Sequence, residues 1–244
     1  MTIRVLVNGA QGKMGQAVIQ AIKLDASLSL VGQTGRSHLL AAEIRNTKAH
    51  VVVDFTQADV AMKNALTIIE SGAHPVIGTS GLIHQDVKEL QQRCKDLTLG
   101  GIVAPNFSLG AVLMMKHAQE IVKYFPAVEI IELHHAGKLD SPSGTAVRTA
   151  EMLQAARTTT PERPTNTRET LPHARGANYC DIPIHSVRLP GMVANQQIIF
   201  GGVGETLTLR HDTIDRQCFM PGVILACKKV ITLKELVYGL ENML

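Results

Sequence analysis

Two adjacent histidines, a lysine and a Ser-Gly-Thr run form the part of this 244-residue chain best suited to chemistry. His134 and His135 are followed by Lys138, and Ser143-Gly144-Thr145 comes shortly after. An imidazole takes up and releases protons near neutral pH, and an ammonium attracts anions. The first N–H groups of a helix also attract anions, because they have no partner within the helix. These residue types predict a site that binds a dianionic small molecule and handles a proton.

Other interpretations of this block stay open. A histidine at a strand end is most often structural, and adjacent histidines on a strand point in opposite directions, so only one need face a pocket. Paired histidines also occur in metal sites, but no third ligand stands nearby at a metal-binding spacing. A nucleophilic triad is disfavoured, because the chain has no G-x-S-x-G elbow.

A second chemical feature opens the chain. Gly9, Gly12 and Gly15 follow an apolar run at residues 3–7 and precede residues with helical spacing. Glycines at a strand-to-helix turn let the backbone approach a pyrophosphate, and the helix N-terminus attracts the phosphate charge. The spacing is G-x-x-G-x-x-G instead of the usual G-x-G-x-x-G. Dinucleotide binding is therefore the main prediction, and glycines that serve only a tight turn are the alternative.

The residues after the second predicted strand bear on the choice of cofactor. An acidic residue that holds a ribose 2′-hydroxyl is expected roughly 20 positions after the glycine loop. The chain has Gly35 and Arg36 there instead. Arg36 can hold a 2′-phosphate by charge-assisted hydrogen bonds, and an ordinary solvated surface charge is the alternative. We expect NADPH to be used at least as well as NADH.

Alternating strands and helices must position the glycine loop. Strands are predicted at 3–7, 28–31, 51–55, 74–77 and 102–104, with helical patterns after the first, the third and the fourth of them. Such alternation predicts a parallel sheet covered by helices on both faces, as in a Rossmann-like nucleotide domain. Residues 78–81 and 104–107 follow two of these strands, at the edge where such sheets bind ligands. Plain turn chemistry is the alternative for both loops.

A different pattern positions the histidine block. A helix over 109–123 leads to a strand over 128–133, which delivers the histidines. Ser143 is expected to cap a helix over 144–156. A long polar stretch at 158–178 has no periodicity, which is typical of a functional or mobile loop.

The last part of the chain predicts an open mixed sheet. Strands are expected at 184–189, 196–200 and 205–211, and the glycine-rich turn at 201–204 favours antiparallel pairing of the last two. The tail at 221–242 is predicted to be helical. Together with the preceding elements, these strands indicate a second, smaller α+β domain.

Composition narrows the class of protein. Hydrophobic residues make up 45% of the chain and charged residues 18%, as in folded globular proteins. A net charge of +3 and only eight Tyr and Phe residues, with no Trp, disfavour a nucleic-acid-binding surface. The sequence shows neither a membrane-spanning apolar run nor a signal peptide, and its four cysteines lack C-x-x-C spacing. We expect a cytoplasmic protein without disulfides or zinc.

A series of short segments over nearly the whole chain forms one recognisable pattern. In chain order, they are Val7-x-Gly-Ala-x-Gly-x-Met-Gly15, Asp54-Phe-Thr56, Ile77-Gly-Thr-x-Gly81, Ala104-x-Asn-Phe-Ser108, Glu129-Ile-Ile-Glu-x-His-His135, Lys138, Asp140-x-Pro-Ser-Gly-Thr-Ala146, Ile184-His-Ser-Val-Arg188, Gly204-Glu205 and Arg216-x-x-Phe219. These segments, in this order, resemble the dihydrodipicolinate reductase family, now called 4-hydroxy-tetrahydrodipicolinate reductases. The block from the histidines to Ala146 is highly specific to that family, whereas the glycine loop is not.

The resemblance implies a two-domain enzyme. Residues 1–106 and 216–244 would form the dinucleotide-binding domain, and residues 107–215 a substrate-binding domain that builds a homotetramer through its sheet. The implied reaction reduces the cyclic dicarboxylate 4-hydroxy-tetrahydrodipicolinate to tetrahydrodipicolinate, with loss of water. NADPH or NADH is the implied reductant, and the pathway is diaminopimelate and lysine biosynthesis.

The resemblance also implies roles for individual residues. His134 is expected to be the proton donor or acceptor, and Lys138 the second proton donor. His135, Gly144 and Thr145 are expected to bind a substrate carboxylate, and no metal is expected. The residues expected to contact the cofactor are Gly9, Ala10, Gln11, Gly12, Lys13, Met14, Arg36, Gly78, Thr79, Ser80, Ala104, Pro105, Asn106 and Phe107.

Two rival functions stay open on sequence alone. An aspartate dehydrogenase-like enzyme would share the plan, but the block from Lys138 to Thr145 argues against it. A non-catalytic cofactor sensor would need a partner-binding surface, and the chain has neither a helix-turn-helix pattern nor a strong basic patch. One departure from the family is Asn195-Gln196, where a Glu-His pair is expected in the central sheet, so a secondary substrate or interface contact is in doubt.

Overall fold

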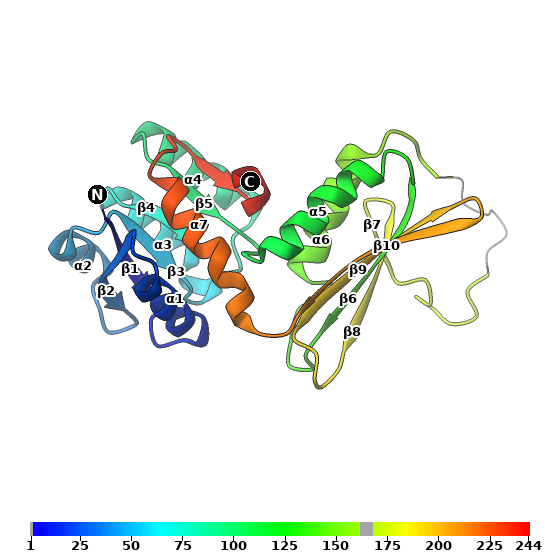
Figure 1. Cartoon of the computed structure of the whole chain (residues 1–244), viewed down its shortest axis with the longest axis horizontal. Coiled ribbons are helices and arrows are strands. Elements are labelled where there is room, and N and C mark those ends of the chain that lie inside the picture. Colours follow the sequence, from blue (N-terminus) through cyan, green and yellow to red (C-terminus); the bar gives the residue numbers. More distant parts are fainter. Residues whose placement is uncertain (1, 162–167) are drawn as a thin grey trace. The chain divides into compact units, whose positions relative to one another are not determined.

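The computed structural model of the chain describes residues 2–161 and 168–244. It divides into two compact units, Met1–Leu109 with Arg216–Leu244, and Gly110–Asp215 (Figure 1). What each unit binds stays a prediction, as does the division at 106/107 and 215/216 into a cofactor domain and a substrate domain. No helix in the described ranges is both long and apolar enough to cross a membrane.

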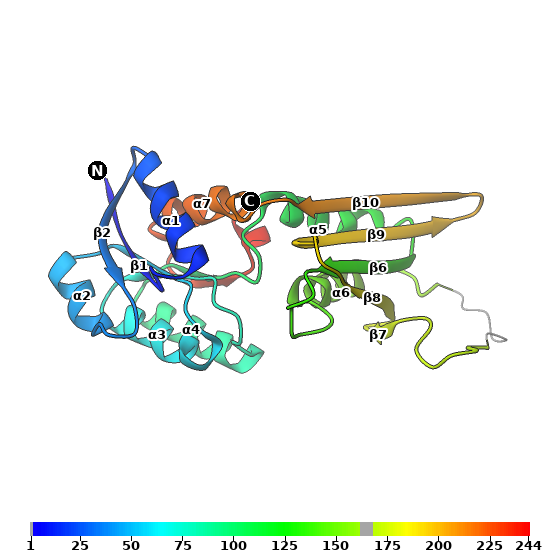
Figure 2. The ribbon, with the colours of Figure 1, turned by 90° about the horizontal axis from the view of Figure 1, so that it is seen from below.

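A parallel sheet of six strands forms the first unit, in the order β11-β5-β4-β3-β1-β2. The central strand β3 (Val51–Asp54) is buried along its whole length, which explains its unbroken apolar run up to Asp54. Figure 2 shows α1 and α7 on one face of this sheet and α2, α3 and α4 on the other. The remaining strands are β1 (Ile3–Asn8), β2 (Leu28–Thr34), β4 (His74–Ile77), β5 (Gly101–Val103) and β11 (Leu236–Tyr238). The helices are α1 (Lys13–Leu24), α2 (Leu40–Thr47), α3 (Ala58–Glu70), α4 (His84–Asp96) and α7 (Met220–Val230), with 3-10 turns at Arg216–Phe219 and Leu240–Met243. The Rossmann-like prediction is confirmed.

The C-terminal tail corrects one prediction. Residues 221–242 are not helical throughout, because α7 ends at Val230 and β11 follows at Leu236–Tyr238. This strand pairs in parallel with β5 and extends the sheet by one strand. A run of three apolar residues carries too little periodicity to distinguish a strand from a helical turn. The open edge of β5 decides the outcome, and that edge exists only in the folded sheet.

The second unit contains a mixed sheet in the order β10-β9-β6-β8-β7. Strand β6 (Ala127–His134) pairs in parallel with β8 (Ile182–Arg188) and antiparallel with β9 (Ala194–Gly202). Strands β9 and β10 (Glu205–Thr213) form the antiparallel pair predicted from the glycine-rich turn. The helices α5 (Leu109–Ile121) and α6 (Gly144–Ala156) supply the rest of its apolar core. The predicted second, mixed sheet is therefore confirmed.

Part of the stretch at 158–178 also differs from the prediction. The short strand β7 begins at Ala177 and pairs antiparallel with β8, although no strand was expected before position 184. All three residues of β7 are exposed. Because none of them faces a core, the sequence carries no alternating apolar pattern from which this strand could be predicted. Residues 162–167 of this stretch lie outside the described residues.

Buried and partly exposed residues alternate along β6, the strand that carries His134. Val128, Ile130 and Glu132 are buried in turn, while the intervening residues are partly exposed. Ile130 packs in the core with apolar residues of α5 and α6. Position 132 continues this buried row, so the side chain of a glutamate lies where an aliphatic residue is expected.

Candidate active site

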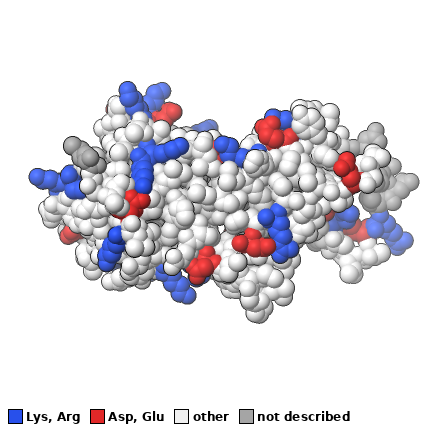
Figure 3. Space-filling view, in the orientation of Figure 1, with Lys and Arg blue, Asp and Glu red and all other residues white. Residues whose placement is uncertain are grey.

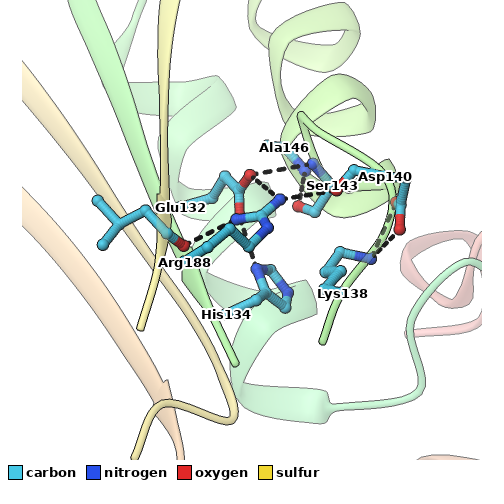
Figure 4. A network of polar contacts seen from close by, with 8 residues as sticks. Glu132, His134, Lys138, Asp140, Ser143, Ala146 and Arg188 are labelled. Carbon is cyan, nitrogen blue, oxygen red and sulfur yellow. Dashed lines mark hydrogen bonds and ion pairs between the residues drawn. The ribbon is translucent and has the colours of Figure 1, made fainter. Parts of the chain in front are cut away.

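A buried carboxylate connects the parts of the histidine–lysine block (Figure 4). The side chain of Glu132 is 0% exposed, and its Oε2 lies 2.5 Å from Nδ1 of His134. The guanidinium of Arg188 meets the same carboxylate with both terminal nitrogens, at 2.8 Å and 2.9 Å. The parallel register of β6 and β8 places His134 opposite Arg188, which brings the three side chains together.

Charged and hydrogen-bonded partners keep Glu132 ionised. Burial alone raises the pKa of a carboxyl group, because it removes water from the charged form. Hydrogen bonds from His134, Arg188 and Ser186 outweigh the burial and lower the pKa of Glu132 to about 2. The group therefore carries a negative charge throughout the neutral range.

The loop after β6 is tied to the same ion pair. Arg188 Nη2 donates to the backbone oxygen of Asp140 at 2.8 Å, and the backbone N–H of Ser143 donates to Glu132 Oε1 at 3.3 Å. Within the loop, Lys138 Nζ lies 2.7 Å and 2.9 Å from the two carboxylate oxygens of Asp140. In Figure 4 the His134 ring and the Lys138 side chain both lie below the Glu132–Arg188 pair. Both residues predicted to handle protons are thus connected to the Glu132–Arg188 ion pair, His134 directly and Lys138 through Asp140.

The pKa of Asp140 responds to this contact. Partial burial raises it, but the hydrogen bond from Lys138, together with the nearby positive charge, produces a net lowering. Asp140 is therefore ionised and forms an ion pair with the ammonium of Lys138. The Ser141–Pro142 peptide bond in the same loop is cis.

The start of α6 carries the predicted carboxylate site. Ser143 Oγ accepts a hydrogen bond from the backbone N–H of Ala146 at 3.2 Å, so the predicted N-cap is confirmed. Gly144 is exposed, and among the described residues a Cβ added to it would meet no heavy atom within 4 Å. Neither packing nor a positive φ therefore requires glycine at this position. Thr145 is half-buried, and His135 is exposed at the end of β6.

The glycine loop in the first unit has structural reasons of its own. Gly9 has a φ of 82°, and a Cβ there would lie 2.4 Å from the backbone oxygen of Phe55. A Cβ on Gly15 would lie 2.2 Å from the backbone oxygen of Gly9. Packing of a tight turn thus accounts for two of the three glycines, whether or not a nucleotide binds.

The end of the loop leaves room for an anion. Gly12 is the N-cap of α1 and makes no side-chain cap. Gln11, Gly12 and Lys13 are exposed, whereas Ala10 is buried and Met14 half-buried. The first N–H groups of a helix lack partners within the helix, so an exposed helix start beside a lysine fits the pyrophosphate of a dinucleotide.

The remaining predicted cofactor residues lie in different environments. Ser80 and Pro105 are exposed, Gly78 and Asn106 are half-buried, and Thr79, Ala104 and Phe107 are buried. The Phe107 ring meets the Phe55 ring edge to face at a centroid distance of 5.8 Å, so it packs against the segment that follows β3. Arg36 is exposed, and its Nη2 donates to Gln57 Oε1 at 2.9 Å. Their roles stay predictions.

A second buried carboxylate lies beneath these loops. Asp54, at the end of β3, is 0% exposed. Its Oδ1 accepts from Thr79 Oγ1 at 2.5 Å and from the hydroxyl and backbone N–H of Thr56 at 2.7 Å and 3.1 Å. Its Oδ2 accepts from Asn8 Nδ2 at 2.8 Å and from Asn64 Nδ2 at 2.9 Å. One carboxylate therefore links the strand end before the glycine loop, the loop after β4, and α3.

Glu132, Arg188 and Asp54 lie in segments that match the family, but the sequence predicts no role for them. A signal was present for Glu132, because a charged residue in the buried row of a strand needs a partner. Its partner Arg188 stands 56 positions away, and nothing in the local pattern joins the two. Among the described residues, no group of three or more His, Cys, Asp or Glu side chains is placed to hold a metal ion.

The surface shows no large area of one charge in the view of Figure 3. Basic and acidic side chains are interspersed there over a mostly uncharged surface. This distribution accords with a formal net charge of only +3.

Two family models together match nearly the whole chain. The model described as dihydrodipicolinate reductase, N-terminus, matches residues 3–107, and the one described as dihydrodipicolinate reductase, C-terminus, matches residues 110–244. Curated proteins named 4-hydroxy-tetrahydrodipicolinate reductase from Legionella pneumophila (strain Lens) and Coxiella burnetii (strain Dugway 5J108-111) are each 52% identical over 244 residues. Both alignments cover 100% of this chain and of the relative.

Solved structures show the same relationship. A dipicolinate-bound dihydrodipicolinate reductase from Paenisporosarcina sp. TG-14 is 42% identical, with a TM-score of 0.88 and complete coverage of both chains. An amine dehydrogenase from Mycobacterium smegmatis has a TM-score of 0.65 at 13% identity, covering 97% of this chain and 95% of that one. The second likeness shows a shared fold alone.

Proposed function

The chain belongs to the dihydrodipicolinate reductase family, and from this premise we propose how its residues perform the family's reaction. That reaction is the reduction of 4-hydroxy-tetrahydrodipicolinate to tetrahydrodipicolinate by a nicotinamide cofactor, a step of diaminopimelate and lysine biosynthesis. The observation that carries the assignment is 52% identity over the full length of curated reductases. The site geometry supports the residue roles proposed below.

The second unit is proposed to hold the cyclic dicarboxylate. Gly144 is exposed at the start of α6 and has no packing reason to be glycine, so close approach of a ligand explains it. Thr145 follows this glycine in sequence and His135 is exposed after β6, and both are proposed to complete the carboxylate site. A relative 42% identical to this chain is described as dipicolinate-bound, which supports a dicarboxylate ligand.

Proton handling is proposed for His134 and Lys138. A bound reduced nicotinamide cofactor supplies the hydride. Negative charge that develops on the substrate is then stabilised by the ammonium of Lys138, which Asp140 holds in place. The imidazole of His134 exchanges a proton with the substrate, a task for which imidazole side chains are commonly used in enzymes.

The first unit is proposed to bind the cofactor, with NADPH used at least as well as NADH. The exposed start of α1 fits a pyrophosphate, and residues 78–80 and 104–107 lie at the same carboxyl ends of the parallel strands. Arg36 is exposed and meets the neutral amide of Gln57. A guanidinium has five N–H donors, so this contact leaves donors for a 2′-phosphate.

A homotetramer built through the five-stranded sheet is also proposed. Strand β10 is nine residues long and lies at the edge of that sheet, with Leu207 exposed on it and Val203 exposed at the turn before it. A long edge strand with apolar side chains is a template for pairing with another chain. Light scattering should give four times the chain mass, and a monomer would contradict the proposal.

We also propose a cytoplasmic location, where reduced nicotinamide cofactor is regenerated, and cell fractionation tests it.

The function is tested with a coupled spectrophotometric assay. The preceding synthase generates the substrate in the cuvette, and oxidation of NADPH is followed by absorbance. Oxidation should require the synthase and its substrates, and pyridine-2,6-dicarboxylate should inhibit it. Oxidation that proceeds equally without the synthase, or activity with L-aspartate and NADP⁺ in its place, would contradict the proposed function.

A further inference from the structure

The buried position of Glu132 calls for a reason beyond stability. It follows Ile130 in the core row of β6, where an aliphatic side chain would avoid the cost of desolvating a charge. Well-packed hydrophobic residues are often at least as stable as a buried ion pair of the same volume. Packing alone therefore does not account for a carboxylate here, whereas its contacts with the active-site groups do.

One of those contacts determines the protonation pattern of His134. An ionised carboxylate only accepts hydrogen bonds, and Glu132 Oε2 lies 2.5 Å from Nδ1. In the neutral imidazole, Nδ1 must then carry the proton, which leaves a lone pair on Nε2. The ring is 13% exposed, so one part of it reaches the surface while Nδ1 faces the buried carboxylate. A ring flip would break the bond to Glu132.

Arg188 keeps the Glu132 carboxylate ionised and connects it to the loop that carries Asp140. Two hydrogen bonds from the guanidinium fix both oxygens of Glu132, at 2.8 Å and 2.9 Å. The same Nη2 donates to the backbone oxygen of Asp140, whose carboxylate meets Lys138. His134 and Lys138 are therefore both connected to the buried carboxylate of Glu132, His134 directly and Lys138 through Asp140 and Arg188.

We infer that Glu132, held by Arg188, is a positioning residue that presents Nε2 of His134 for proton exchange with the substrate. The inference rests on the proposed function, in which His134 handles a proton. In each turnover a proton moves between Nε2 and the substrate. The proton on Nδ1 stays in the hydrogen bond to Glu132, which neither gains nor loses a proton itself.

The chain offers a matched control on the same strand. Glu129 also contacts a histidine and an arginine, with its Oε2 2.8 Å from His185 Nε2 and its Oε1 paired with Arg175. Its side chain is 35% exposed and lies on the opposite side of β6 from Glu132. Glu129→Gln removes the same chemical group from the same sheet without touching His134.

The first experiment is a double-mutant cycle on turnover. Glu132→Gln and His134→Gln are each expected to lower kcat by about 10²-fold, and the double variant should be no slower than His134→Gln alone. Binding of pyridine-2,6-dicarboxylate and the KM for NADPH should change less than about threefold in Glu132→Gln, because that residue acts on the proton step. Glu129→Gln should stay within about twofold of the wild type.

The outcomes separate the inference from the function beneath it. Losses that multiply in the double variant would show that Glu132 acts independently of His134 and would overturn the inference. Near-wild-type turnover in Glu132→Gln, with a large loss in His134→Gln, would also overturn it but leave the proposed function intact. If His134→Gln itself keeps its turnover, the proposed function fails.

A second measurement reads the wild-type protein, and a variant serves only to assign its signals. Glu132→Gln leaves the Arg188 charge unpaired, so a neutral pair, Glu132→Gln with Arg188→Met, is prepared beside it. In the wild type, ¹⁵N NMR of histidine-labelled protein reads the tautomer of His134, whose signals are assigned by their loss in His134→Gln. We expect a protonated Nδ1 and a bare Nε2 in the neutral ring. A neutral ring protonated on Nε2 in the wild type would overturn the inference.

Discussion

Both units of the molecule bury a carboxylate beneath their proposed binding loops, and the two groups are satisfied in different ways. Asp54 accepts hydrogen bonds from amides and hydroxyls, all of them neutral. Glu132 accepts them from a guanidinium and an imidazole. Neutral donors hold chain segments in place but do not titrate near neutral pH, whereas an imidazole does.

The difference separates two tasks within one enzyme. The donors to Asp54 come from the strand end before the glycine loop, from the loops after β3 and β4, and from α3, so this carboxylate sets loop geometry. The donors to Glu132 include the residue proposed to exchange a proton. Loss of Asp54 should therefore weaken cofactor binding, and disturbance around Glu132 should slow turnover. The predictions below test this division, from the largest expected effect to the smallest.

The largest effect is expected for the groups proposed to handle protons. His134→Gln or Lys138→Met should lower kcat by about 10²-fold or more, because each removes a group that acts in the transition state. Affinity for the cofactor, measured by fluorescence titration, should remain within about threefold. Lys123→Met, in an exposed ion pair with Glu120, serves as the control. Near-wild-type turnover in both active-site variants would contradict the assigned roles.

Acid stability should reveal the charged environment of Glu132. Its pKa falls from 4.5 to about 2 in the folded chain, so its contribution to stability is present above pH 4.5 and is lost as pH falls towards 2. The shift corresponds to about 3 kcal/mol at most. The Glu132→Gln, Arg188→Met pair should flatten this part of the pH–stability curve, as measured by urea unfolding between pH 2 and 5. An unchanged curve would show that the ion pair does not lower the carboxyl pKa.

Asp54→Asn is expected to weaken cofactor binding by about tenfold, because its amide nitrogen would face donors where an acceptor is required. The change is nearly isosteric, so the core of β3 stays filled. Isothermal titration should show weaker NADPH binding and unaltered binding of pyridine-2,6-dicarboxylate. Asp59→Asn, on the exposed first turn of α3, is the control. Equal weakening of both ligands would mean that the two carboxylates do not have separate tasks.

The smallest effect is expected at Arg36. Arg36→Ala should lower kcat/KM for NADPH relative to NADH by about fivefold to tenfold, because one charge-assisted hydrogen-bonding group to the 2′-phosphate is lost. Steady-state kinetics with both cofactors measure the ratio, and Arg45→Ala on α2 controls for a lost surface charge. A wild-type enzyme that strongly prefers NADH would remove the basis of this prediction.

Much of the fold was predictable from short-range patterns. The apolar runs at β1, β3 and β4, the helices α1, α3 and α4 and the serine cap of α6 were predicted correctly, because hydrophobic periodicity and capping act within a few residues. The short strands β7 and β11 did not, since each has three residues and depends on a neighbouring strand for its hydrogen bonds. Strand formation there is a tertiary effect.

The types of residue in the site could be predicted from the sequence, but the ion pair between Glu132 and Arg188 that holds them could not. His134, Lys138 and Ser143 stand close in sequence, so their spacing alone indicated a common site. Arg188 lies on another strand, and only the register between β6 and β8 places it against Glu132. The glycine loop shows a similar limit, because the clash with Phe55 that requires Gly9 comes from a distant strand end.

By itself, the sequence determined the local elements, the family and the side chains that stand within about ten residues of His134, because these depend on neighbours along the chain. Only the tertiary structure decided which charges meet in the interior. Pairing of β6 with β8 joins groups 56 positions apart, and burial removes the water that would otherwise solvate them. Glu132 must then be neutralised by the partners that strand pairing supplies, and those partners are Arg188 and His134.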